Sequence, residues 1–153
     1  MTLHQRSTTA DWPELAFDAW SDTVATLHMW LQMVGKIRLV QSPWVNHSWH
    51  VPLYLTSRGL TTSPIPHGAR SFQIDLDFIE HTLSIAKDDG STRRMKLEPR
   101  SVADFHAELF GHLEAMGLGV AIHTTPSEIP DATRFEGDHG HHAYDAEYAH
   151  RFW

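Results

Sequence analysis

Ser71-Phe-Gln-Ile-Asp-Leu-Asp-Phe78 is the clearest strand in the sequence, because apolar and polar residues alternate along it. Successive side chains of a strand point to opposite faces of a sheet, so this alternation predicts one buried face and one polar face. The predicted buried face carries Phe72, Ile74, Leu76 and Phe78, and the polar face carries Gln73, Asp75 and Asp77.

Two more strands are predicted directly after this one. Residues 82–87 and 92–97 alternate in the same way, and Asp88-Asp-Gly90 between them is typical of a tight hairpin turn. The three strands are therefore expected to form an antiparallel meander. Residues 49–56 also alternate, and Pro52 places them at a sheet edge or a bulge. Residues 120–123 could add one more short strand.

Two helices are predicted, one before and one after these strands. Residues 18–38 and 101–116 each repeat apolar residues at helical spacing. Ser101 and Asp104 have the spacing of a capping box at the start of the second helix. We therefore predict an α+β fold, in which an antiparallel four- to five-stranded sheet carries two helices packed on one face.

The expected domain organisation has three parts. Residues 1–12 form a flexible lead-in, and residues 13–125 form a single α+β domain. Residues 126–153 form an irregular, histidine-rich tail, in which a further helix starts at Asp145. A chain of 153 residues is long enough to bury one core of this kind.

Composition narrows the classes of function. The formal net charge is −7 and the basic residues are scattered, apart from Arg93-Arg-Met-Lys96, so nucleic acid is not expected as a partner. The chain has no cysteine, which excludes disulfides, thiolate metal sites and a thiol nucleophile. It has neither a secretory signal nor a long apolar run, so we expect a soluble cytoplasmic protein without a membrane partner.

The most distinctive stretch is Trp44-Val-Asn-His-Ser-Trp-His-Val-Pro-Leu-Tyr54. A buried His, Trp or Asn needs a hydrogen-bond partner, so this mixture indicates a shaped surface rather than a plain strand. The hydroxyls of the following loop, Gly59–Pro66, could hold an anion between stiff prolines, although a structural turn is the alternative. The candidate ligand-binding residues are His47, His50 and Tyr54 in the first segment, Thr61, Thr62 and Ser63 in the loop, and Arg58 directly before the loop.

A second candidate site lies on the polar face of the predicted sheet. The residues that would share this face are His50, Tyr54, Asp75 and Asp77. Two carboxylates with a histidine could hold a divalent transition metal, or act as general acid and base. Alternatively, the face is only solvated, and Arg94 and Lys96 balance the aspartates across the strands.

The tail carries the densest set of side chains that can bind metal. Its histidines are His139, His141 and His142, beside Glu136 and Asp138. Imidazole and carboxylate together suit zinc, nickel, copper or iron. The glycines around these residues, however, indicate a segment that is not preorganised for one ion.

Several blocks of this sequence resemble one family of uncharacterised bacterial proteins. These blocks are Trp12-Pro-Glu-Leu15, Thr26-Leu-His28, Val34-Gly-Lys36, Trp44-Val-Asn-His47, Trp49-His-Val-Pro-Leu-Tyr54, Gly59-Leu-Thr-Thr-Ser-Pro-Ile-Pro66, Asp75-Leu-Asp-Phe-Ile79 with His81, Pro99-Arg-Ser-Val-Ala-Asp-Phe105, Tyr144-Asp-Ala-Glu-Tyr-Ala149 and Arg151-Phe-Trp153. The family is known only as a domain of unknown function, so the resemblance implies no activity. It is a resemblance to the N-terminal half of longer members, which implies that part of a site would lie outside this chain.

Two classes of function are therefore expected. The first is a small-molecule binding or interaction domain, a homodimer included, that uses the Trp44–Tyr54 surface and the Gly59–Pro66 loop. The alternative is a metal-dependent enzyme with a site at His50, Asp75 and Asp77. No catalytic motif in the sequence is complete, which favours the first class.

Overall fold

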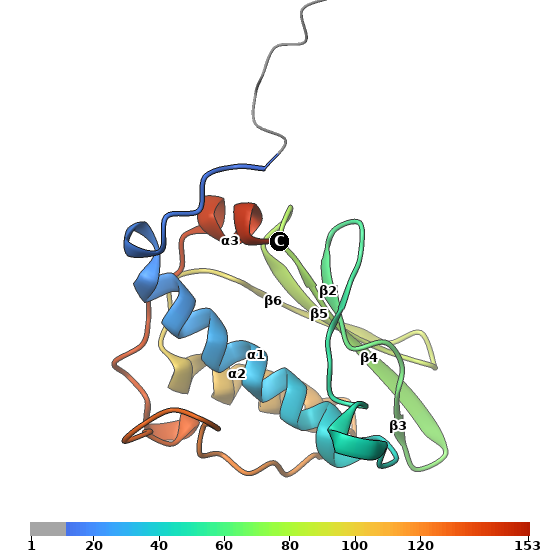
Figure 1. Ribbon diagram of the computed structural model, residues 1–153. Helices are drawn as coiled ribbons and strands as arrows, with labels where there is room; N and C mark the ends of the chain where they lie inside the picture. The colour runs from blue at the N-terminus through green and yellow to red at the C-terminus, as the bar shows by residue number, and fades with distance from the viewer. Residues whose placement is uncertain (1–11) are drawn as a thin grey trace, which may run out of the picture.

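The centre of the molecule is an open antiparallel sheet of six strands. The computed structural model describes residues 12–153, so the predicted lead-in lies, apart from Trp12, outside the described residues (Figure 1). The strands are β1 Tyr54–Leu55, β2 Gly59–Thr61, β3 Ile65–His67, β4 Arg70–Asp77, β5 Thr82–Lys87 and β6 Thr92–Lys96. Their order is β1-β2-β4-β5-β6, and β3 pairs with β4 along the same edge as β2.

The predicted α+β class and the meander of β4, β5 and β6 are confirmed, but the sheet has six strands instead of four to five. The additional pairing comes from residues 59–67, which the sequence indicates as a loop. Ser63 has a positive φ of 54° and interrupts this segment. The two three-residue strands on either side of the interruption therefore pair with separate parts of β4.

The predicted strand over residues 49–56 is wrong for most of its length. The short 3₁₀ helix η2 (Asn46–Ser48) precedes an irregular stretch, and the chain joins the sheet only at β1. His47 and Ser48 have positive φ angles of 54° and 60°, which turn the backbone sharply before the alternating residues begin. Residues 120–123 form no strand either.

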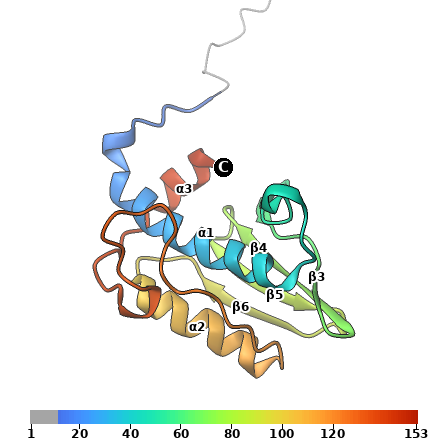
Figure 2. The same cartoon turned by 60° about the horizontal axis from the view of Figure 1, so that its bottom comes forward.

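Three α-helices complete the fold, namely α1 Ser21–Gln41, α2 Val102–Ala115 and α3 Ala146–Phe152, with the short 3₁₀ helices η1 Phe17–Ala19 and η3 Phe135–Gly137. Figures 1 and 2 show α1 and α2 side by side on one face of the sheet, as predicted. The tail helix α3 starts at the expected place, because the carboxylate of Asp145 accepts a hydrogen bond from the N–H of Tyr148.

The core lies between this pair of helices and the sheet, and it includes the apolar face of β4. Trp30 of α1 stacks with two other aromatic rings, at centroid distances of 4.5 Å to Phe105 and 5.4 Å to Tyr144. Phe135, Tyr144 and Ala149 of the tail are buried in the same core. The tail therefore packs onto the domain instead of trailing from it.

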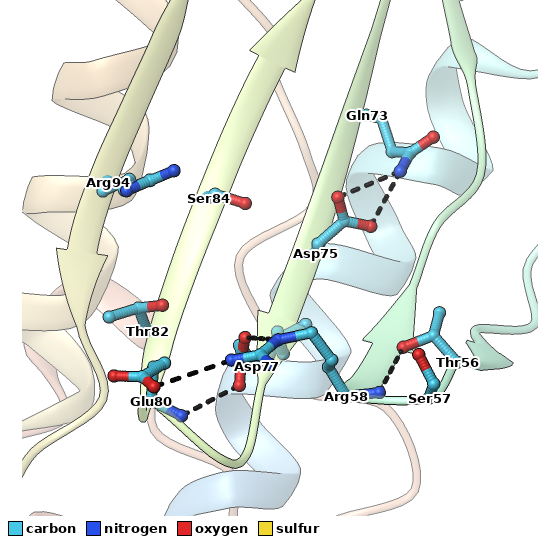
Figure 3. Close-up of a pocket in the computed structure, with 11 residues that line it drawn as sticks. Thr56, Ser57, Arg58, Gln73, Asp75, Asp77, Glu80, Thr82, Ser84 and Arg94 are labelled. Carbon is cyan, nitrogen blue, oxygen red and sulfur yellow. Dashed lines mark hydrogen bonds and ion pairs between the residues drawn. The ribbon is translucent and has the colours of Figure 1, made fainter.

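The opposite face of the sheet, called the outer face below, is covered by none of the helices of residues 12–153 (Figures 2 and 3). Its polar side chains are accessible, and they position the candidate site. In the same range of residues, every helix is too short or too polar to cross a membrane.

Candidate functional site

A groove of about 690 Å³ lies on the outer face, over β4, β5 and β6. Figure 3 shows its side chains, which come from these strands and from the β1–β2 and β4–β5 turns. The residues that line the groove are Thr56, Ser57, Arg58, Gln73, Asp75, Leu76, Asp77, Glu80, Thr82, Ser84 and Arg94. The surface is thus polar, and it carries charges of both signs.

The middle of the groove is one row of residues across three strands. Asp75 of β4 pairs with Ser84 of β5, and Ser84 pairs with Arg94 of β6. Because residues in register point to the same face, a carboxylate and a guanidinium lie on either side of a hydroxyl. Asp75 accepts two hydrogen bonds of 2.9 Å from the Nε2 of Gln73. Figure 3 shows Arg94 pointing along the outer face and not paired with Asp75.

Asp77, at one end of the groove, is fully engaged by its neighbours. Its Oδ1 accepts the N–H groups of Ile79 and Glu80, and its Oδ2 lies 2.6 Å from the Nε of Arg58. Burial alone would raise the pKa of this carboxyl, but the N–H of Glu80, the Arg58 guanidinium and the N–H of Ile79 outweigh it and lower the pKa. Asp77 therefore holds the β4–β5 turn, and Asp75 is the carboxylate left for a ligand.

The prediction that His50 shares the outer face with Asp75 and Asp77 is wrong. The His50 side chain is buried, with an exposed fraction of 6%. The N–H of Val45 donates to its Nδ1, so Nε2 carries the proton and donates to the carbonyl of Leu39, both at 3.2 Å. Backbone atoms occupy both ring nitrogens, which leaves neither for a metal or a ligand.

Tyr54 does not line the groove either, because its ring lies against Arg38 of α1. The guanidinium carbon of Arg38 is 5.1 Å from the centre of the Tyr54 ring. Arg38 is buried and donates to the carbonyls of His50 and Thr62 and to the Oγ of Ser63. This side chain joins the segment after α1 to the segment after β2.

The hydroxyls of the Gly59–Pro66 loop bond within the fold. Thr61 Oγ1 accepts the N–H of Ser63, and Ser63 Oγ donates to the carbonyl of Thr62. Thr62 Oγ1 donates to the carbonyl of Ser63 and accepts the N–H of Ile74 in β4. This arrangement favours the structural turn over the anion site, and Arg58 points instead to Asp77 in the groove.

The segment from Trp44 to Tyr54 forms an apolar surface separate from the groove. Trp44 and Trp49 are exposed by 71% and 68%. His47 is exposed beside them, with its ring centre 6.4 Å from that of Trp49. Of the nine candidate ligand-binding residues, the structure brings together only Arg58, Asp75 and Asp77 in the groove.

The candidate metal cluster of the tail is organised around α2. Asp138 is buried and accepts the N–H groups of Gly140 and His141, and its Oδ2 lies 2.7 Å from the Nδ1 of His141. The carbonyls of Asp138 and His141 accept the first N–H groups of α2, those of Ala103 and Val102. The segment thus supplies hydrogen-bond acceptors for the first N–H groups of α2, which lack partners within the helix.

The metal sites considered from the sequence are not assembled. His139 and His142 are exposed, and His142 Nδ1 bonds to the carbonyl of Gly140. In the part of the chain that the structure describes, no group of three or more His, Asp or Glu side chains is arranged to hold a metal ion. The geometry therefore gives the metal-enzyme interpretation no support.

Sequence reasoning missed Ser84 and Thr82 as groove residues, and it treated Arg94 only as a counter-charge. The signal that could have found them is the register of the meander. Counting back from the Asp88–Gly90 turn and the β4–β5 turn places Asp75, Ser84 and Arg94 in one row. Alternation alone gives the face of each side chain but not its neighbours on the next strands.

Comparison with known proteins gives a family and no activity. A family model described as a family of unknown function, DUF5996, matches residues 12–153, which confirms the resemblance noted from the sequence. Neither the curated proteins nor the solved structures contain a match.

Proposed function

This chain belongs to the DUF5996 family, whose description carries no activity, and we propose from the groove itself that the protein binds a small zwitterionic molecule. The observation that carries this proposal is the row Asp75–Ser84–Arg94, in which opposite charges flank a hydroxyl without pairing. Among the ion pairs of residues 12–153, none joins Arg94 to a carboxylate. The proposal keeps the small-molecule class expected from the sequence and moves its site to the outer face.

The chemistry of the row selects the ligand class. A carboxylate such as Asp75 accepts hydrogen bonds from an ammonium group, whereas an arginine such as Arg94 pairs with a carboxylate in a bidentate manner. Ser84 between them can donate to, or accept from, a polar group in the middle of the ligand. A molecule with a cationic and an anionic end thus matches the row in charge and order.

The spacing of the strands limits the length of this molecule. Neighbouring strands lie about 4.8 Å apart, so the backbones at Asp75 and Arg94 are roughly 10 Å apart. With one hydrogen bond of about 3 Å at each end, the two charges of the ligand lie roughly 4 Å apart when both bonds run along the row, and further apart when the bonds are inclined to it. Short ω-amino acids and dipeptides have charge separations of this order.

The test is a titration of the isotope-labelled protein with 4-aminobutyrate and, separately, with glycylglycine. Binding is monitored through the NMR chemical shifts of the backbone amides. We expect shifts on β4, β5 and β6 around the row. Asp75→Asn and Arg94→Gln should each weaken binding about tenfold or more, because each removes one charged hydrogen-bonding partner. Butylamine and butyrate, which carry one charge each, should bind more weakly than the zwitterions.

Arg93→Gln is the matched control. Arg93 precedes Arg94 in the same strand and pairs with Ile85, whose side chain is in the core, so it belongs to the other face of the sheet. This variant loses the same charge and should bind as the wild type does. An equal loss in the control, or the absence of shifts on the outer face with either zwitterion, would overturn the proposal.

A further inference from the structure

An uncharged, apolar surface stands beside the sheet, at the end of α1. No Asp, Glu, Lys or Arg occurs between Arg38 and Arg58, although charged residues make up 20% of the chain. Figure 2 shows this segment, with η2 in it, projecting from the layers of sheet and helices. Two exposed tryptophans and four exposed aliphatic residues of this segment are called the tryptophan surface below, and they are Leu39, Val40, Trp44, Val45, Trp49 and Leu55.

The tryptophan surface is held in place from beneath. His50 bonds to the backbone on two sides, and the Trp44 ring packs against the His50 ring at a centroid distance of 5.5 Å. Arg38 ties the same segment to the carbonyl of Thr62. Consecutive positive φ angles at His47 and Ser48, an unfavourable conformation for serine, shape the turn that presents Trp49. A surface ordered in advance loses little conformational entropy when it binds.

The size of the surface matches one side of a protein interface. Trp44, Trp49 and Leu55 are exposed by 71%, 68% and 73%, and the other members by 38–48%. With 150–250 Å² for each tryptophan and somewhat less for each leucine or valine, the exposed area of the six residues sums to on the order of 700 Å². This sum is close to the roughly 800 Å² that each partner contributes to a standard interface.

The lack of charge on this surface, together with its exposed area, points to the occupant. The chain carries a net charge of −7, so two copies repel each other over most of their surfaces, but not through a segment without charged residues. A two-fold axis would bring this surface against itself and would bury no unpaired charge. A strongly charged partner of another kind would find no complementary charge here. We propose that the tryptophan surface is the contact of a two-fold symmetric homodimer.

The experiment is sedimentation of the full chain over a range of protein concentrations, from micromolar to millimolar. The wild type should form dimers that dissociate on dilution. The double variant Trp44→Ser, Trp49→Ser should raise the dimer dissociation constant at least about 100-fold, because buried aromatic residues at the centre of an interface dominate its affinity. Trp12→Ser is the matched control, since Trp12 is 84% exposed but lies outside the surface, and it should leave the dissociation constant unchanged.

Leu55→Glu provides a second test that removes no packing from the His50 side chain. It places a charge at an exposed position of the surface, and in a symmetric dimer it places two, so it should also dissociate the dimer. Circular dichroism of the variants confirms that they fold. A wild type that remains monomeric throughout would overturn the proposal and leave the surface to a different partner. A dimer that survives both sets of substitutions would also overturn it, because its contact would then lie elsewhere.

Discussion

Arg38 and His50 are buried polar side chains whose partners are backbone atoms from neighbouring segments. Such groups are tolerated inside a protein when their hydrogen bonds are made. From the sequence alone, a histidine near two tryptophans could bind a ligand, bind a metal or make structural hydrogen bonds. Spacing does not reveal which carbonyl faces the ring, and the carbonyl of Leu39 reaches His50 only because the chain folds back over the end of α1.

Gly59 is the residue at which a side chain is least tolerated. It has a φ of +155° where β2 meets β4, and an added Cβ would lie 1.9 Å from the carbonyl oxygen of Leu76. We expect Gly59→Ala to reduce the free energy of unfolding by about 2–4 kcal/mol, because the clash is with backbone that cannot move aside. Urea denaturation measures this change.

Gly111 offers the control for the same substitution. It lies in α2, its φ is not positive, and an added Cβ meets nothing within 4 Å. Gly111→Ala should therefore stabilise the protein by about 0.5–1 kcal/mol through helix propensity. Equal effects at the two glycines would contradict this account of Gly59.

At the scale of the element, α2 follows its sequence signals closely. The predicted cap is present, because Ser101 Oγ accepts the N–H of Asp104 at 3.0 Å and donates to its carboxylate at 2.7 Å. The helix then ends at Ala115, with Met116 as its C-cap before Gly117, which has a positive φ of 69°. These signals act within four residues, which is why they can be recognised without the fold.

Ser101→Ala tests the contribution of this cap. The substitution leaves the N–H of Asp104 without its partner and should lower the free energy of unfolding by about 1 kcal/mol. Ser101→Thr keeps the hydroxyl and should retain most of the stability. Thermal and urea denaturation of the pair measure the difference, and an equal loss in both variants would assign it to packing at this buried position rather than to the cap.

The short strands β2 and β3 show the opposite behaviour. Each has three residues, and together with the Thr62–Pro64 interruption they have the composition of a loop. Their strand character comes from β4, whose edge opposite β5 would lack hydrogen-bond partners without these two short strands. Backbone groups at such an edge need partners, so neighbouring segments pair wherever they can reach it.

At the scale of the whole molecule, the tail is fastened to the sheet through titratable groups. His81, in the β4–β5 turn, bonds through Nδ1 to the hydroxyl of Tyr144 at 2.9 Å. Burial lowers the pKa of His81, the charge of His150 lowers it further, and Asp77 and Glu80 oppose this. Burial also lowers the pKa of His106, which Glu136 opposes.

These shifts predict that acid weakens the fold. Because the folded-state pKa of His81 lies below its ordinary value of about 6.5, the unfolded chain binds more protons as the pH falls through that value. The free energy of unfolding should therefore decrease from pH 7 towards pH 5. His81→Asn should make this decrease shallower, because it removes the imidazole that takes up the proton. Asparagine is the replacement because it tolerates the positive φ of 51° at this position.

His47→Asn is the control for this prediction. His47 also has a positive φ, but its side chain is exposed beside Trp49. Urea denaturation at a series of pH values compares the two variants with the wild type. A pH dependence that changes equally in both would show that the effect does not come from the partly buried hydrogen bond between His81 and Tyr144.

Local patterns in the sequence were sufficient to predict the α+β class and the starts of α2 and α3. They also predicted the meander of β4 to β6 with its apolar and polar faces. Each of these depends on a side-chain period or on a hydrogen bond between residues a few positions apart. Asp75 and Asp77 could be assigned to the polar face for the same reason.

Contacts between distant parts of the chain were needed for everything else. They divide residues 59–67 into two strands, bury His50 beneath Trp44, and use the tail around Asp138 to satisfy the start of α2. They also give Asp75 and Asp77 different roles, since one is saturated by a turn and the other faces Ser84 and Arg94. The physical reason is that hydrogen-bond partners and charges act through space, and their distances are set by the packing of the whole fold.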